Sequence, residues 1–187
     1  MANLLTRYEA VFSKSDQQVS RTELVHHSIP TTEGTRPNRQ PLYRLLPHKE
    51  QEAACQVQDL LARGMIEPAN RAWSSPVSPG TQKRPVLAVL RGLQEAERRD
   101  AASGYWQVPL YADAQEKSAF TTCSGLWKWK VLLFGLTSAP ATFQRLMEQV
   151  LHGLHWKTLV LYLDDVIVIS PDFTSHLQRL EDVFERL

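Results

Sequence analysis

An acidic pair between two apolar runs constrains this chain more than any other feature. Asp164 and Asp165 interrupt residues 159–169, whose other positions are all Leu, Val, Ile or Tyr. Such runs are typical of buried strands, and Asp is favoured in turns, where its carboxylate stays hydrated. The pattern predicts a β-hairpin with two carboxylates at its tip. Two like charges this close favour a bound cation, and oxygen ligands suit Mg²⁺; an ordinary acidic surface turn is the simpler interpretation of the pair alone.

Composition narrows the class of protein without naming a function. The 187 residues are 43% hydrophobic and 22% charged, which is ordinary for a globular chain. The net charge of +1 predicts no overall attraction to nucleic acid, so any basic site must be local. Cys55 and Cys123 stand far apart and are expected to be free thiols in a reducing compartment. No secretory leader or membrane span is expected, which favours an intracellular location.

Periodicity predicts a mixture of helices and strands. The clearest helical pattern lies between Phe143 and Leu154, where apolar residues recur at i, i+3, i+4, i+7, i+8 and i+11. Ser138 is expected to cap this helix, with Pro140 in its first turn. Further helices are predicted over 2–12, 47–63 and 174–187, and strands over 23–29, 86–90, 105–110, 116–122 and 126–133.

The strand predicted over 126–133 alternates aromatic and basic residues. Trp127 and Trp129 share one face, and Lys128 and Lys130 share the other. Interleaved aromatic and basic residues can hold single-stranded nucleic acid by stacking and phosphate contact. A half-buried strand with outward lysines fits the same pattern equally well.

Several ordered motifs resemble one family. Tyr162-Leu-Asp-Asp165 resembles the Tyr-x-Asp-Asp box of reverse transcriptases, and residues 134–147 are similar to the segment that precedes this box in Ty3/gypsy-type retrotransposon and retroviral-like Pol polyproteins. Residues 63–70 with 73–77, residues 103–108 and residues 116–120 match the same family in the same order. The resemblance covers nearly all of the chain except residues 78–99.

The resemblance implies an α+β fold, namely the fingers and palm of a right-hand polymerase fragment, with an antiparallel palm sheet, packed helices and no thumb. It divides the chain into an extended lead-in (1–46), a fingers-like region (47–99, degenerate at 78–99) and a palm-like region (100–187). The implied reaction is RNA-directed DNA synthesis, in which two Mg²⁺ ions, with Mn²⁺ as an alternative, assist transfer of a nucleotide to a primer 3′ end.

The same resemblance assigns candidate site residues. The implied catalytic and metal-binding carboxylates are Asp164, Asp165 and Asp100. The residues implied to bind the nucleotide are Tyr105, Phe134, Gly135, Pro140, Gln144 and Arg84. Nucleic-acid contacts are expected from Lys128, Lys130 and Arg145.

This chain departs from the family pattern between residues 78 and 99. The Lys-Lys-Asp-Gly element is not recognisable there, and the apolar strand that normally leads into the first catalytic aspartate is missing. Asp100 is therefore either the motif aspartate or an aspartate placed at that spacing by a deletion. We expect the isolated chain to be weak or inactive in catalysis, since catalysis is sensitive to ångström-scale misplacement. The alternatives are a nucleic-acid-binding or interaction remnant without catalysis, and the translation of a decayed element.

The partners implied are an RNA or DNA template with its primer, deoxynucleoside triphosphates, and the protease, RNase H and integrase of an intact Pol polyprotein. No membrane partner is expected. The implied location is the cytoplasm or a virus-like particle.

Overall fold

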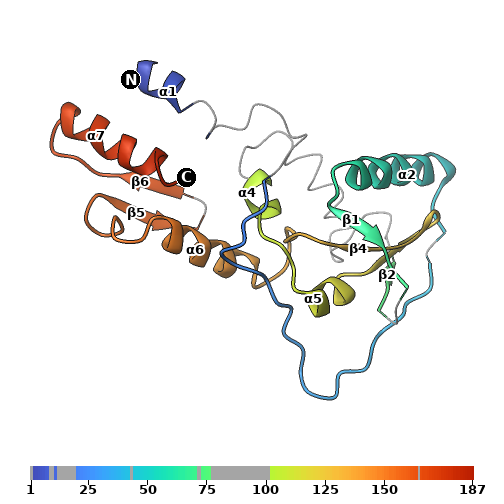
Figure 1. Ribbon diagram of the computed structural model, residues 1–187. Helices are drawn as coiled ribbons and strands as arrows, with labels where there is room; N and C mark the ends of the chain where they lie inside the picture. Colours follow the sequence, from blue (N-terminus) through green and yellow to red (C-terminus); the bar gives the residue numbers. More distant parts are fainter. Residues whose placement is uncertain are drawn as a thin grey trace. The chain divides into compact units, whose positions relative to one another are not determined.

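The chain forms two compact units. The computed structural model describes residues 2–8, 11, 20–42, 44–70, 73–76, 102–163 and 165–187. One unit comprises Gln17–Ala139, and the other combines Met1–Asp16 with Pro140–Leu187. Each is described by itself below, and Figure 1 labels most of their elements. The three sequence regions (1–46, 47–99 and 100–187) remain a prediction.

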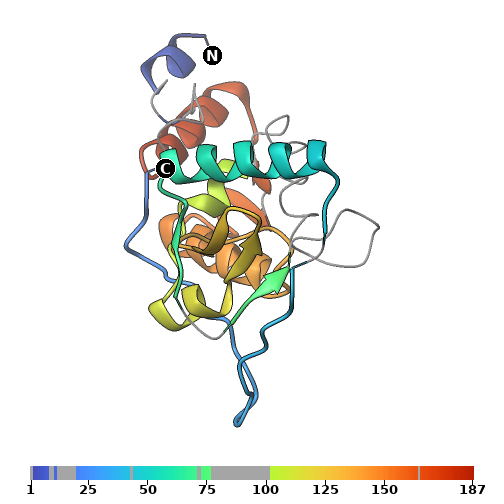
Figure 2. The same cartoon turned by 90° about the vertical axis from the view of Figure 1, so that its right-hand side faces the viewer.

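A four-stranded sheet organises the unit of residues 17–139. Its order is β1-β4-β3-β2, and both pairs that involve β4 are antiparallel, whereas β2 lies parallel to β3. Figures 1 and 2 show this sheet with its helices. The strands are β1 (Ile66–Pro68), β2 (Ser75–Pro76), β3 (Phe120–Thr122) and β4 (Gly125–Trp129), and the helices are α2 (Pro47–Ala62), α4 (Ala102–Trp106) and α5 (Ala112–Lys117).

Helix α2 confirms the prediction over 47–63. Pro47 occupies its first turn, where a missing N–H costs nothing. Ala53, Val57 and Leu60 are buried on one face. Gly64 follows at φ +66°, a conformation that suits glycine and ends the helix before β1.

The β3–β4 hairpin is confirmed, but its first arm is shorter than predicted. Residues 112–117 form α5, because Ala, Gln, Glu and Lys favour helix, and β3 begins only at Phe120. Thr122 pairs with Gly125, which leaves Cys123 and Ser124 in the turn. Trp129 is 1% exposed and its ring centroid lies 5.6 Å from that of Phe120, so this hairpin carries the core of the unit.

The strand predicted over 105–110 is wrong over most of its length. Residues 102–106 form helix α4 instead. Tyr105 and Trp106 are adjacent and both buried, whereas successive residues of a strand point to opposite faces. Only Pro109 and Leu110 make strand-like bridges, to Val131 and to His27.

Residues 20–42 form an extended lead-in that is tied to this unit. The strand predicted over 23–29 is wrong except for the bridge at His27. The His27 N–H donates to the Pro109 carbonyl (2.9 Å), and its own carbonyl accepts from Tyr111 N–H (3.0 Å). The His27 side chain is buried, and its Nε2 lies 3.4 Å from Ser138 Oγ.

The second unit packs helices on a two-stranded sheet. It holds α1 (Ala2–Arg7), most of α6 (Ala139–Val150), β5 (Leu159–Tyr162), β6 (Asp165–Val168) and α7 (Phe173–Phe184). The helices predicted over 138–154 and 174–187 are confirmed, and the helix predicted over 2–12 is confirmed for residues 2–7. Asp172 begins α7 by accepting from the Ser175 N–H (2.9 Å). The core residues are Leu151, Leu159, Leu161 and Val183, with Met147, Val150, Leu154, Val166 and Val168 packed against them.

Candidate active site

The predicted acidic hairpin is present. Strands β5 and β6 pair antiparallel from Leu159 with Val168 to Tyr162 with Asp165, so the connecting turn has two residues, Leu163 and Asp164. Two-residue hairpin turns require positive φ at their first position, and Leu163 has φ +53°. Asp165 is exposed, and among the described residues nothing bonds to its side chain. Asp164, the other predicted catalytic and metal-binding carboxylate of the pair, lies outside the described residues.

One face of the hairpin anchors it and the other is open. Leu159 and Leu161 are buried, and the opposite residues of β6, Val166 and Val168, pack on the same core. The other face is solvent-accessible, with Tyr162 69% and Ile167 55% exposed. The hairpin is therefore half-buried, not enclosed on both faces as its apolar runs suggested.

Helix α6 supports the turn of the hairpin. The Gln144 Oε1 accepts a hydrogen bond from the Leu163 N–H (2.8 Å), and its Nε2 donates to Glu148 Oε1 (2.8 Å). Arg145 is exposed, and its guanidinium lies 3.4 Å from the hydroxyl of buried Thr142. This helix thus brings one residue predicted to bind nucleotide, Gln144, to the acidic turn.

In the other unit, two predicted nucleotide-binding residues meet. The Tyr105 and Phe134 rings lie 4.5 Å apart between centroids at a tilt of 50°. Tyr105 is 4% exposed, whereas Phe134 is partly exposed and is followed by Gly135 at φ +87°. Pro140, the second residue of α6, belongs to the unit of the acidic hairpin. The predicted sites at Arg84 and Asp100 lie outside the described residues.

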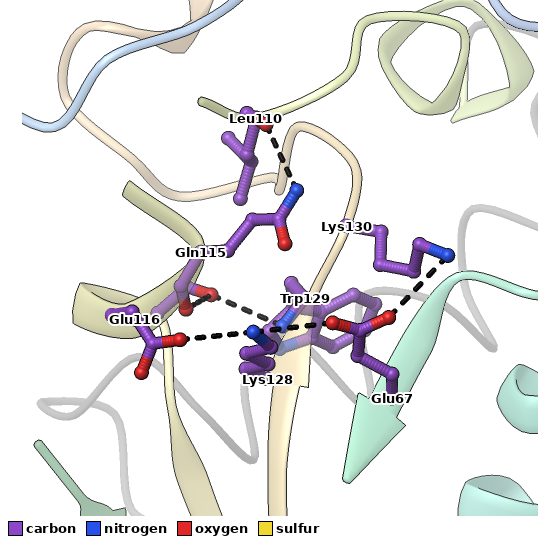
Figure 3. Close-up of polar contacts among 8 residues, drawn as sticks. Glu67, Leu110, Gln115, Glu116, Lys128, Trp129 and Lys130 are labelled. Atoms are coloured by element: carbon purple, nitrogen blue, oxygen red, sulfur yellow. Dashed lines mark hydrogen bonds and ion pairs between the residues drawn. The ribbon is translucent and has the colours of Figure 1, made fainter. Parts of the chain in front are cut away.

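The lysines predicted to contact nucleic acid are engaged by carboxylates (Figure 3). Lys128 Nζ lies 2.9 Å from Glu116 Oε1 and 3.1 Å from Glu67 Oε1, and Lys130 Nζ lies 3.4 Å from Glu67 Oε2. The hydrogen bond from Lys128 lowers the pKa of Glu67, and the hydrogen bond to Glu116 raises the pKa of Lys128. These lysines form ion pairs with carboxylates of their own unit, and their contact with nucleic acid remains a prediction.

Sequence reasoning missed both acidic partners. Glu67 faces Lys128 directly in the antiparallel register of β1 with β4, and Glu116 stands on α5. The signal was the short alternation Ile66-Glu67-Pro68, which places Glu67 on the face opposite buried Ile66. Recognising it would have required knowing that β1 pairs with β4.

Comparison with known proteins decides the family. Residues 65–187 match the family described as reverse transcriptase (RNA-dependent DNA polymerase). This chain belongs to the reverse transcriptase family. The match includes the acidic hairpin, α6 and the β3–β4 hairpin, so the resemblance to a reverse transcriptase of a retroelement Pol polyprotein is confirmed.

Relatives of this reverse transcriptase chain are polyproteins. It is 29% identical to the retrovirus-related Pol polyprotein from transposon 297 of Drosophila melanogaster, over 100% of this chain and 21% of that protein. It is 39% identical to the enzymatic polyprotein of figwort mosaic virus, over 54% of this chain and 15% of that protein. The chain therefore spans about a fifth of the first relative's length and less of the second's.

Solved structures confirm the polymerase fold. Foamy viral protease–reverse transcriptase in complex with an RNA/DNA hybrid has a TM-score of 0.73 at 21% identity, over 100% of this chain and 28% of that one. The same protein in complex with double-stranded DNA has a TM-score of 0.70 at 22% identity, over 99% and 44%. The predicted α+β fold, with the fingers and palm of a polymerase, is confirmed.

The donor atoms at the hairpin fit the divalent metal ions that reverse transcriptases use. Asp165 offers an exposed carboxylate, and the residue before it in the sequence, Asp164, also carries a carboxylate. Carboxylate oxygens are the ligands that Mg²⁺ and Mn²⁺ prefer. Within the described residues, no group of three or more metal-ligating side chains comes together.

No helix in the described part of the chain is long and apolar enough to cross a membrane.

Proposed function

We propose that the turn between β5 and β6 is the metal-binding half of a polymerase site, and that Asp164 and Asp165 are its ligands. The observation that carries the proposal is the two-residue turn itself, because it sets an exposed carboxylate at the tip of a hairpin anchored by an apolar face. The family match supports the same assignment. Asp100 is the third proposed ligand.

The proposed reaction is template-directed nucleotidyl transfer. A bond forms between the primer 3′ oxygen and the α-phosphorus of a deoxynucleoside triphosphate, and pyrophosphate leaves. Bound Mg²⁺ or Mn²⁺ would supply charge stabilisation for the attacking and leaving oxygens. The aromatic pair of Tyr105 and Phe134, with Gly135 beside it, would hold the nucleotide, and Arg145 would contact the nucleic-acid backbone.

We also propose that this chain is impaired in catalysis. Its alignment with the transposon 297 polyprotein runs over 219 positions, 32 more than the 187 residues of this chain, so at least 32 positions of the relative face gaps. A loss of this size agrees with the missing Lys-Lys-Asp-Gly element and apolar strand in residues 78–99. Without that strand, Asp100 lacks a rigid support, and misplacement by about 1 Å can cost 10²-fold in rate.

The biological setting follows the relatives. The proposed partners are a primer annealed to an RNA or DNA template and the other parts of a Pol polyprotein, namely protease, RNase H and integrase. The proposed location is intracellular, in the cytoplasm or a virus-like particle. A chain that binds primer–template without extending it would act as a nucleic-acid-binding remnant, which the unmatched positions of the transposon 297 polyprotein favour as the second candidate function.

Binding and extension of a DNA primer on an RNA template, measured in parallel with Mg²⁺, test both proposals. We expect binding that weakens steeply with salt, since phosphate contacts release counterions. We expect extension to be slow or undetectable, and any extension to disappear in Asp164→Asn and Asp165→Asn. Asp182→Asn, on α7 of the same unit, is the matched control and should change neither quantity.

The outcomes separate the proposals. Fast extension that Asp164→Asn abolishes would contradict the impairment and support the polymerase site. Extension that persists in both hairpin variants would contradict the assignment of the site. If the chain shows no binding and no extension, that result would contradict both candidate functions.

A further inference from the structure

The backbone at Leu163 adopts a conformation that leucine rarely takes. Its φ is +53°, in the left-handed region, where a side chain crowds the following carbonyl. Gly, Asn and Asp are the usual residues at such positions of a two-residue hairpin turn. Leu163 is also 42% exposed, so burial of its side chain offsets little of this cost. The conformation persists only where surrounding contacts hold it.

Gln144 makes such a contact from α6. Its side-chain Oε1 accepts a hydrogen bond from the Leu163 N–H at 2.8 Å. A backbone N–H in an exposed two-residue turn has no partner in the sheet ladder, so this amide oxygen fixes the peptide unit that enters the acidic pair. The two residues are 19 positions apart in sequence and belong to the same compact unit.

Glu148 sets the orientation of the Gln144 side-chain amide by binding its nitrogen end. Its Nε2 donates to Glu148 Oε1 at 2.8 Å, one helical turn further along α6. The carboxylate accepts only, so it selects the NH₂ end of the amide and leaves the oxygen for Leu163. Glu148 is exposed, whereas Gln144 is partly buried. Glu148, Gln144 and Leu163 thus form a chain of two hydrogen bonds from the helix to the turn.

We infer that Gln144 is a positioning residue, which holds the left-handed turn at Leu163 and thereby sets the direction of the Asp165 carboxylate at the start of β6. This differs from the role implied by the family resemblance, in which Gln144 binds the nucleotide. The consequence for metal binding rests on the proposed function of the hairpin. The contact between Gln144 and Leu163 does not, so the two can fail separately.

Hydrogen exchange of the Leu163 amide, followed by NMR on the full chain, tests the contact directly. In Gln144→Leu we expect this amide to exchange about threefold to tenfold faster, the value of one hydrogen bond. Amides inside β5, such as Leu161, should be unchanged. Gln149→Leu is the matched control on the same helix, because its side chain is exposed and makes no hydrogen bond or ion pair with another described residue.

An exchange of partners provides the rescue. The double variant Gln144→Glu/Glu148→Gln keeps an acceptor oxygen for Leu163 and a donor–acceptor pair along α6. We expect it to restore the slow exchange of the Leu163 amide that Gln144→Leu loses. A Leu163→Gly background should reduce the effect of Gln144→Leu, since glycine adopts the left-handed conformation without support.

The effect on the site is measured with Mn²⁺ alone. We expect Gln144→Leu to weaken Mn²⁺ binding at the hairpin by about threefold or more, with the melting temperature lowered by no more than the few degrees that one hydrogen bond explains. Where extension is measurable, kcat should fall while the KM for the nucleotide stays constant, whereas loss of a nucleotide contact would raise KM.

Unchanged exchange of the Leu163 amide in Gln144→Leu would overturn the inference, whatever happens to metal binding. A rise in nucleotide KM without a change in kcat would also overturn it, in favour of a direct nucleotide contact. Faster exchange in a chain that binds no Mn²⁺ would support the positioning role and contradict the proposed function of the hairpin.

Discussion

The two lysines on and beside β4 and the aspartate that begins β6 differ in what surrounds their charges. Lys128 and Lys130 on and beside β4 are matched by Glu67 and Glu116 of their own unit. The side chain of Asp165, at the start of β6, is exposed and has no bonding partner among the described residues. The lysine charges are neutralised from within their unit, whereas no described residue neutralises the charge of Asp165.

The difference shows why a charge pattern alone does not identify a binding site. Both pairs lie beside aromatic or apolar residues, and both suggested a ligand from sequence. The lysines are satisfied by β1 and α5, because an antiparallel register brings Glu67 opposite Lys128. Asp165 directly follows a tight turn and is exposed, so its carboxylate remains hydrated and available. The two cases differ in whether side chains of the same unit neutralise the charge, not in the sign of the charge.

The largest expected effect concerns what anchors the acidic hairpin. Leu161→Ala removes a buried side chain from the core under β5 and should lower the free energy of unfolding by about 2 to 4 kcal/mol. Urea denaturation measures the loss. Val160→Ala, on the opposite face of the same strand, is the control and should cost less than half as much. Equal losses would show that both faces of the hairpin are packed, contrary to the exposure of Ile167.

A smaller effect is expected at the neutralised pair. Lys128→Met keeps most of the side-chain volume but leaves Glu67 and Glu116 without their shared ammonium. We expect a loss of about 2 kcal/mol in the free energy of unfolding, below the cost of breaking a fully buried pair, since these carboxylates are partly exposed.

Lys130→Met is the matched control for this substitution. Its ammonium is 3.4 Å from one carboxylate, and its side chain is about twice as exposed as that of Lys128 (33% against 17%). We expect a loss of less than about 1 kcal/mol. A larger loss in Lys130→Met than in Lys128→Met would contradict the role assigned to Lys128.

The smallest effect is the pH dependence of this network. Because the pKa of Glu67 lies below its ordinary value of 4.5, its stabilising contribution is present above that pH and is lost as pH falls through the lowered pKa. The pKa of Lys128 lies above its ordinary 10.5, so its contribution is present below that pH and is lost as pH rises further. As pH is lowered into the acid range, the melting temperature should fall less steeply in Lys128→Met than in the original chain. Parallel slopes would contradict the coupling.

The sequence predicted best where a pattern is local. Helix α6 was predicted from apolar residues at helical spacing, and the acidic hairpin from the runs on both sides of one polar pair. Each pattern is confined to about a dozen residues and repeats with a single period. Helix α4 was missed because it has only five residues, Ala102–Trp106, which is too short for any period to be visible.

The contacts that refine the site could not be predicted, because they join distant residues. Glu67 meets Lys128 only when β1 pairs with β4, and Gln144 meets Leu163 only when α6 packs beside the hairpin. His27 gave no signal in a polar lead-in, yet it is buried beside Ser138. These are tertiary contacts, and no local propensity encodes them. Asp100 and Asp164 remain predictions.

Paramagnetic broadening by Mn²⁺ tests the central claim, that the acidic turn binds a divalent ion, most directly. In an amide NMR spectrum of the full chain, we expect substoichiometric Mn²⁺ to broaden the signals of Tyr162, Leu163 and Asp165 first, and Asp165→Asn to abolish this selectivity. The signals of Lys128 and Lys130 should stay sharp, because that network carries its own neutralising charges. Broadening that begins elsewhere, or that survives Asp165→Asn unchanged, would contradict the account.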